Sequence, residues 1–170
     1  GDFRSTATFG THSITSLGQE DGFIAQIDTS GNWQWAKSIG GWMYDYVNDV
    51  AGHPSGGAVV VGKIQNDVVS FGPDTLESTS SSYNLGYLAS ISENGDWLWA
   101  EGIGDAGHNY AKNVDIDSNG DIIVSGEFSD TLTLDSFSAV EGSTNQGDHI
   151  FVAKYSEGIL PEDGWQYLAT

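Results

Sequence analysis

Short stretches of apolar and polar residues, separated by glycine-rich turns, follow one another along the whole chain. The segment "AVVVGKI" (58–64) is rich in β-branched residues, which favour strands. In "WLWAEGI" (97–103), simple alternation places Trp97 and Trp99 on one face of a strand and Leu98 on the other. No window of eleven or more residues has the periodicity of an amphipathic helix. The pattern therefore predicts an all-β chain.

The same segments recur at a constant offset. Trp33 and Trp97 lie 64 positions apart, as do Trp35 and Trp99, and "GGAVVVGKI" aligns with "GDIIVSGEF" at that offset. Similarity at a constant period is the mark of a repeat architecture. The 170 residues amount to about 2.7 units (170/64).

Each unit is expected to form four strands joined by tight turns, with a short hairpin around Val68–Leu76. Gly31 and Gly95 supply the positive φ that such turns require. One four-stranded meander cannot bury both of its faces, but stacked meanders can. The predicted fold class is all-β, with β-propeller-type four-stranded antiparallel blades. Closed propellers have about four to eight blades, so this number of units makes an incomplete ring or part of an assembly.

The chain is predicted to be a single domain in three parts. These are a partial blade at 1–40, a blade at 41–104 and a blade at 105–170. The first unit lacks its first strand and nearly all of its second, because "GDF" (1–3) matches "GKI" (62–64). Three explanations remain open: a fragment of a longer repeat protein, blades of several chains that complete one ring, or an open edge that exchanges strands in a fibre.

The charge of the chain is strongly acidic, with 24 Asp and Glu against 5 Lys and Arg. Nucleic acids and anionic membranes need cations on their partner, so both are disfavoured as ligands. No apolar run is long enough to insert into a membrane. The acidity fits either a solvated surface or a set of carboxylates that gathers cations, with calcium as the candidate cofactor.

One segment has the spacing of a calcium loop. "DIDSNGD" places oxygen ligands at alternate positions around a glycine, and the candidate ligands are Asp115, Asp117, Asn119 and Asp121. The twelfth position of such a loop normally holds a bidentate glutamate, but here it is Gly126. The aligned stretch of the preceding unit has no carboxylates at all. A plain hairpin turn between two strands is therefore the alternative interpretation.

A second candidate site lies where the repeat breaks. The loop "GGWMYDY" (40–46) is aligned with "GDAGHNY" (104–110), so its aromatic residues are not required by the repeat. Trp42, Tyr44 and Asp45 are the predicted ligand-binding residues, because exposed loop aromatics stack on sugar rings or bury themselves in subunit contacts. The alternative is that they only cover the end of the core.

Several of these segments resemble one known family, the SBBP-type β-propeller repeat of bacterial and archaeal exported proteins. The motifs are the W-x-W-A strand, the S-G-x-x-x-V-x-G strand, and F-G followed by a hairpin. The third unit departs from the pattern, with Leu134-Asp135 in place of F-G. The resemblance implies a β-propeller in an extracellular or cell-surface setting, with no enzymatic activity and no defined ligand.

The chain contains no HExxH, GxSxG or Walker motif, and it is predicted not to be an enzyme. The expected function is that of a non-catalytic extracellular module for adhesion, scaffolding or surface assembly. Its expected partners are further copies, other propeller blades, or a glycan or protein ligand. The alternatives are a carbohydrate-binding lectin that uses loop aromatics, with or without calcium, and a subunit of a strand-exchanging fibre.

Overall fold

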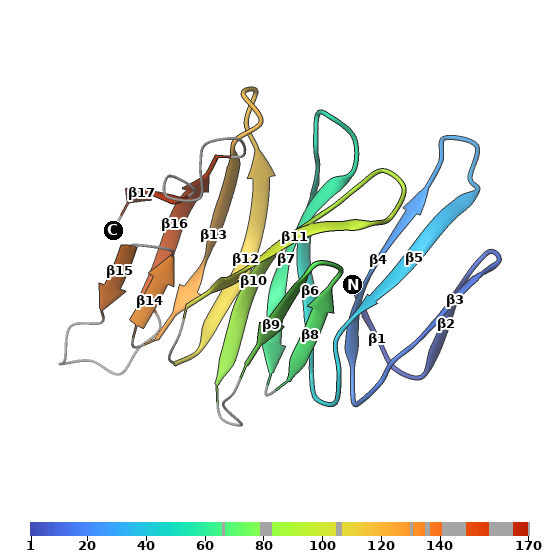
Figure 1. The fold of residues 1–170 in the computed structure, drawn as a ribbon, viewed down its shortest axis with the longest axis horizontal. Coiled ribbons are helices and arrows are strands. Elements are labelled where there is room, and N and C mark those ends of the chain that lie inside the picture. The colour runs from blue at the N-terminus through green and yellow to red at the C-terminus, as the bar shows by residue number, and fades with distance from the viewer. Residues whose placement is uncertain are drawn as a thin grey trace.

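The computed structural model of the chain forms strands and turns, with no helix, throughout the residues that it describes. It describes residues 1–65, 67–78, 83–104, 107–129, 131–134, 137–140, 149–156 and 165–169 (Figure 1). Within these residues the predicted all-β class is confirmed. None of them forms a helix of the length and apolarity needed to cross a membrane. Residue 105, at the predicted boundary between two blades, and Asp135 lie outside the described residues.

Three antiparallel sheets are built in chain order. Sheet 1 consists of β1 (Asp2–Phe3), β4 (Asp21–Ile27) and β5 (Trp33–Ile39). Sheet 2 consists of β6 (Tyr46–Gly52), β7 (Ala58–Gln65), β10 (Asn84–Ile91) and β11 (Trp97–Ile103). Sheet 3 consists of β12 (Asn109–Ile116), β13 (Ile122–Phe128), β16 (His149–Tyr155) and β17 (Trp165–Ala169). In each sheet the strands pair in the order in which the chain makes them.

A small hairpin is inserted into each unit before its third strand. The hairpins are β2 (Thr6–Phe9) with β3 (His12–Thr15), β8 (Val68–Phe71) with β9 (Asp74–Glu77), and β14 (Thr131–Leu134) with β15 (Phe137–Val140). The second of them is the hairpin that the sequence predicts around Val68–Leu76, and its position is confirmed. The structure has four strands in sheets 2 and 3, as expected, and three in sheet 1.

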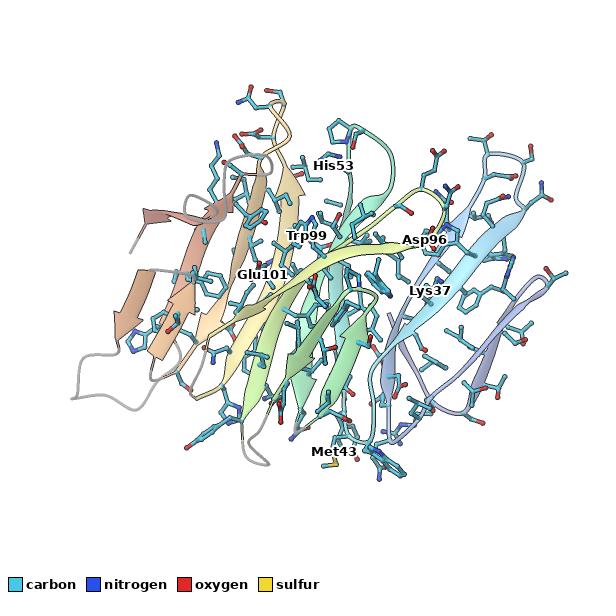
Figure 2. All side chains as sticks on the ribbon, in the orientation of Figure 1. Lys37, Met43, His53, Asp96, Trp99 and Glu101 are labelled. Carbon is cyan, nitrogen blue, oxygen red and sulfur yellow. The ribbon has the colours of Figure 1, made fainter. Side chains whose placement is uncertain are left out.

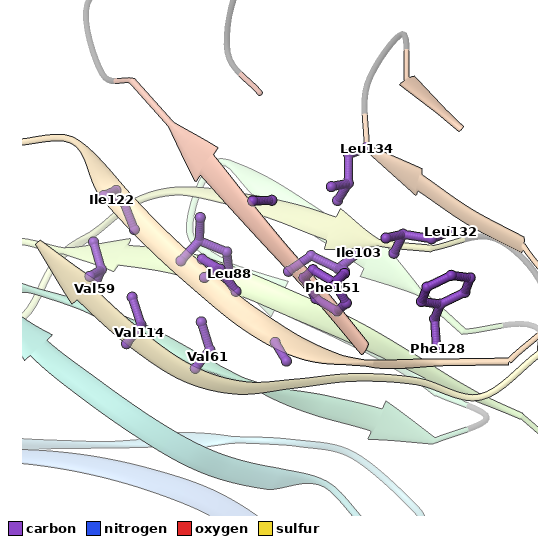
Figure 3. Packing of buried hydrophobic residues seen from close by; sticks show 13 residues of the cluster. Val59, Val61, Leu88, Ile103, Val114, Ile122, Phe128, Leu132, Leu134 and Phe151 are labelled. Atoms are coloured by element: carbon purple, nitrogen blue, oxygen red, sulfur yellow. The ribbon is translucent and has the colours of Figure 1, made fainter. Parts of the chain in front are cut away.

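The three sheets lie side by side with their faces toward one another, like the leaves of a partly opened book (Figure 1). Sheets 1, 2 and 3 follow one another in a stack. In sheets 2 and 3, we call the face that points toward the preceding sheet the N-side face, and the opposite face the C-side face. In sheet 1, the C-side face points toward sheet 2 and the N-side face points away from it. Sheet 2 is buried on both: Val60 and Tyr87 face sheet 1, whereas Val59 and Leu88 face sheet 3 (Figure 3). Burial on both faces explains why β7 is a continuous apolar run instead of an alternating one.

Two separate cores hold the stack together. The core between sheets 1 and 2 contains Ile24, Ile39, Val47, Val60, Ile64, Val69, Phe71, Tyr87, Ala89, Ile91 and Ala100. The core between sheets 2 and 3 contains Val59, Val61, Leu88, Ile103, Ala111, Val114, Ile122, Val124, Phe128, Leu132, Leu134, Phe151 and Ala153 (Figure 3). Each large side chain buried in this way stabilises the fold by about 1.5–3 kcal/mol. Most of the stability therefore comes from contacts between sheets.

The prediction that Trp97 and Trp99 share one face is wrong. Trp97 packs against the core between sheets 1 and 2, and Trp99 packs against the core between sheets 2 and 3. The pairing of β10 with β11 shifts here, so that Trp97 and Leu98 together oppose the single residue Ile91. This β-bulge moves the alternation by one residue. Each tryptophan pair therefore contributes one ring to each face of its sheet.

Candidate functional site

The loop between β5 and β6 carries the predicted ligand-binding residues. Trp42 is 77% exposed, and its neighbour Met43 lies at the lower tip of the loop (Figure 2). Tyr44 is half-buried, with the guanidinium carbon of Arg4 5.9 Å from the centre of its ring. Asp45 is fully buried. The three predicted residues are thus close in the chain, but only Trp42 presents a largely exposed surface.

Asp45 uses its carboxylate to hold the backbone around it. Its Oδ1 accepts a hydrogen bond from the backbone N–H of Gln65 at 2.9 Å, and its Oδ2 accepts one from Gly41 at 2.9 Å. Two further carboxylates anchor the same region. Asp67 accepts from the backbone N–H groups of Trp42 and Met43, and Asp21 accepts from that of Leu17 at 3.1 Å. We call Asp21, Asp45 and Asp67 the junction acids, because they join sheet 1 to sheet 2.

Burial and neighbouring carboxylates raise the pKa values of two of the junction acids, Asp45 and Asp21. Burial raises the pKa of Asp45 to about 6, and the charges of Asp67 and Asp21 act in the same direction, whereas the N–H groups of Gln65 and Gly41 oppose the shift. Burial also raises the pKa of Asp21, whose Oδ1 is buried without a hydrogen-bond partner among the described residues. Ionising these groups inside the junction therefore costs free energy.

A row of polar and aromatic side chains crosses all three sheets at the same end as the junction acids. Its members are Arg4, Glu20, Tyr46, Lys63, Asn84, Tyr110, Lys112 and Glu127. Tyr46 donates to Glu20 at 2.9 Å, and the ammonium of Lys63 lies 4.7 Å from the centre of the Tyr46 ring. Asn84 donates to the hydroxyl of Tyr110 at 2.9 Å. The contact of Tyr46 with Glu20 joins sheet 2 to the first unit, and that of Asn84 with Tyr110 joins sheet 2 to sheet 3, whereas Lys63 and Tyr46 lie within sheet 2.

This polar row holds three of the five basic residues of the chain, namely Arg4, Lys63 and Lys112. Burial raises the pKa of Tyr46 to about 12, and Glu20 adds to the shift. Burial lowers the pKa of Lys63. The sequence patterns named Asp45 as a ligand-binding residue but indicated neither the row nor the part that Asp21, Asp45 and Asp67 play in the contact between sheets. Two features of the sequence point to the row. Tyr46 and Tyr110 lie 64 positions apart, and the chain has few cations.

The candidate calcium ligands lie at the turn between β12 and β13. Asp117 Oδ1 accepts from the backbone N–H groups of Asn119 at 2.8 Å and Asp121 at 3.1 Å. The ammonium of Lys154 lies 2.5 Å from Asp121 Oδ2 and 3.5 Å from Asp117 Oδ2. Asp115 lies within β12 and its Oδ1 accepts from the N–H of the next residue. The ammonium of Lys154 therefore already neutralises two of the three carboxylates among the four candidate ligands.

The same kind of turn occurs without the calcium pattern between the third and fourth strands of the first two units, β4–β5 and β10–β11. Asp28 accepts from the N–H groups of Ser30 and Asn32, and Ser92 accepts from that of Asp96. The glycine of each turn has positive φ: 86° at Gly31, 82° at Gly95 and 88° at Gly120. The geometry at Asp117 is that of the hairpin-turn alternative. In the described part of the chain, no group of three or more His, Cys, Asp or Glu side chains is arranged to hold a metal ion.

A three-ring cluster occurs twice, where each inserted hairpin meets its sheet. It is formed by Phe9, Phe23 and Trp33 in sheet 1 and by Phe71, Tyr87 and Trp97 in sheet 2. The phenylalanine of the hairpin lies 5.0 Å from the tryptophan in both clusters, measured between ring centres. We call these clusters the aromatic triads. The triad of sheet 2 lies under sheet 1, whereas among the described residues no further sheet covers the triad of sheet 1.

Comparison with known proteins adds no name to this arrangement. No protein-family model matches the chain, and no curated protein matches it. The similarity to the SBBP-type repeat therefore stays a prediction from the residues. Among the described residues, the surfaces that the chain offers a partner are the exposed loop at Trp42 and the outer faces of sheets 1 and 3.

Proposed function

We propose that the chain is a non-catalytic, extracellular module of β-propeller type whose three sheets are consecutive blades. It acts in adhesion, scaffolding or surface assembly by stacking its open sheet face on a further blade. The observation that carries this proposal is the pair of aromatic triads. In sheet 2 a neighbouring sheet buries Phe71 and Tyr87 fully and Trp97 partly, whereas the equivalent rings of sheet 1 have no such neighbour among the described residues.

The backbone contacts between sheets support the same proposal. The first strand of one sheet packs on the C-side face of the sheet before it, β6 on sheet 1 and β12 on sheet 2. Because each contact uses the same positions of the repeat, a further blade that precedes sheet 1 can pack against it in the same way, as in other repeat proteins. Such a surface binds a β-sheet of matching shape and needs no reactive group.

Completing sheet 1 tests whether it is a blade. A copy of residues 41–61, placed before Gly1, supplies the equivalents of β6 and of the first part of β7. We expect the extended chain to melt at a temperature higher by about 5 °C or more, because β1 now pairs with β4 over two residues only. A chain extended by the same residues in scrambled order is the control. Equal melting temperatures for the two extended chains would contradict the proposal.

A carbohydrate-binding function is the second candidate, and the exposure of Trp42 favours it. The lectin function predicts that specific glycans on an array retain the chain and that Trp42→Ala abolishes this binding. The exposed Leu98→Ala, on another part of the surface, serves as the matched control. If no glycan binds, the result contradicts the lectin function and favours the assembly function.

A further inference from the structure

The C-side faces of the three sheets differ at one position. Gly22 in β4, Gly86 in β10 and Ile150 in β16 succeed one another at 64-residue intervals. Each pairs with an equivalent residue of the neighbouring strand, Gly86 with Lys63 and Ile150 with Glu127. The three positions are therefore structurally equivalent, but only the third has a side chain.

The two glycines allow the next sheet to approach closely. A Cβ atom at Gly22 would lie 2.9 Å from the backbone nitrogen of Val47, and one at Gly86 would lie 3.2 Å from that of Ala111. Both distances are shorter than normal contacts of a Cβ atom. The backbone of the next sheet's first strand thus crosses directly over the glycine, where a larger residue has no room.

Two side chains beside Gly86 hold the strand that crosses it. Asn48 Nδ2 donates to the backbone oxygen of Ala111 at 2.7 Å, and Asp49 Oδ2 accepts from the backbone N–H of Val114 at 3.0 Å. The C-side face of sheet 2 therefore binds β12 through its main chain, with a glycine below and two polar clamps at the side.

Sheet 3 lacks all three features. Ile150 is 75% exposed on its C-side face. Lys112 stands at the position of Asn48 and forms an ion pair with Glu127 at 3.3 Å. Asn113 stands at the position of Asp49 and donates from Nδ2 to the hydroxyl of Ser125 at 3.4 Å. Both clamp positions are thus engaged within sheet 3 itself.

We propose that sheet 3 is the closed end of the stack and that Ile150 closes it. A further blade cannot pack on sheet 3 as β6 and β12 pack on sheets 1 and 2. The N-side face of sheet 1, by contrast, accepts the C-side face of a blade that has glycine at the position of Gly86. This inference rests on the proposed function, and it gives the assembly a direction, with capping at one end as in other repeat proteins.

Opening the closed end tests the inference. The glycine and clamps of sheet 2 receive a first strand, which sheet 1 lacks, so the test uses the chain extended by residues 41–61 before Gly1. In this extended chain, the substitutions Lys112→Asn, Asn113→Asp and Ile150→Gly give sheet 3 the glycine and clamps of sheet 2. We expect the extended chain with wild-type sheet 3 to stay at its monomer mass in light scattering. The triple variant should at least double its weight-average mass as its concentration rises, because the open face of sheet 1 in one copy now fits sheet 3 of another.

Two controls assign the contact. The variant with Lys112→Asn and Asn113→Asp alone keeps Ile150 and should remain monomeric. Adding Phe23→Ser to the triple variant changes the N-side face of sheet 1 and should restore the monomer. Circular dichroism and melting curves establish that each variant is folded.

Three results would overturn the inference: a folded triple variant that stays monomeric, an extended chain with wild-type sheet 3 that associates as strongly as the triple variant, or association that survives Phe23→Ser. The extension of sheet 1 by residues 41–61 does not involve sheet 3. Its outcome therefore separates a failure of this inference from a failure of the proposed function.

Discussion

The N-side faces of sheets 1 and 2 carry equivalent aromatic residues in a similar geometry but in different surroundings. In sheet 2, Phe71 and Tyr87 are fully buried because sheet 1 lies over them. In sheet 1, the equivalent Phe9 and Phe23 are only half-buried. The difference teaches that the triad is built for a neighbour, because the same rings complete a core where a sheet covers them and form a surface where none does.

The largest expected effect comes from removing the ring that the third strand of each unit contributes to its triad, Tyr87 in β10 and Phe23 in β4. Tyr87→Ala should lower the free energy of unfolding by about 4 kcal/mol, since the ring is fully buried and its hydroxyl donates to the backbone oxygen of Tyr46 at 3.1 Å. Phe23→Ala should cost about half as much. Urea unfolding measures both. Equal losses of unfolding free energy in the two variants would contradict the difference in burial between the two faces.

The contact between sheets 1 and 2 also differs from the next one in its chemistry. Asp45 and Asn109 stand at equivalent positions and are both buried, but only the aspartate ionises. The amide of Asn109 donates to the backbone oxygen of Gly107 at 3.5 Å, whereas Asp45 accepts from two backbone N–H groups. Through this position, only the contact between sheets 1 and 2 is therefore expected to change its stability with pH.

The pH dependence follows from the raised pKa of Asp45, about 6 in the folded chain against the 3.8 of an unperturbed aspartate. Between these values the native state binds more protons than the unfolded state, so stability is full below about pH 4 and falls as pH rises through 6. We expect a loss of about 2 kcal/mol from this group between pH 4 and 7. Urea titrations of the wild type and of Asp45→Asn at both pH values measure it.

The contribution of Asp45 is the difference between these two chains, because other carboxylates titrate in both. Asp45→Asn should remove the decline, and Asp115→Asn, which changes an exposed carboxylate, should preserve it. A decline of the same size in the wild type and in Asp45→Asn would show that the junction acids do not control it.

Calcium should have a smaller effect. Because the ammonium of Lys154 already lies against Asp117 and Asp121, millimolar calcium must displace it, and we expect a change in melting temperature below about 2 °C. In Lys154→Ala the carboxylates lose their cation, so the same addition, reversed by a chelator, should raise the melting temperature further. A large shift in the wild type would favour the calcium loop over the plain hairpin turn.

The smallest effects are expected at the turns themselves. Gly31 and Gly120 have positive φ, and a Cβ atom at either would meet no other atom within 4 Å. Alanine at either position should therefore cost only the backbone strain, about 1 kcal/mol. Thermal melts of both variants provide the comparison. A much larger loss at one turn would indicate a contact absent from the other.

The constant offset in the sequence predicted the strands, the inserted hairpin and the positive φ of Gly31 and Gly95, because these depend on local residues. It failed at Trp97 and Trp99, where a bulge changes the alternation. It also did not indicate the part that the junction acids play in the contact between sheets. Asp21 and Asp67 are far apart in the chain and meet only through sheet packing, which no local pattern records.

Amide hydrogen exchange of the unmodified chain tests the stacking of the sheets most directly. If neighbouring sheets supply most of the stability, the amides of β10, in the sheet buried on both faces, should exchange only on global unfolding. Those of β4 should exchange at least about 100-fold faster, because sheet 1 opens separately. Equal protection of β4 and β10 would contradict this account.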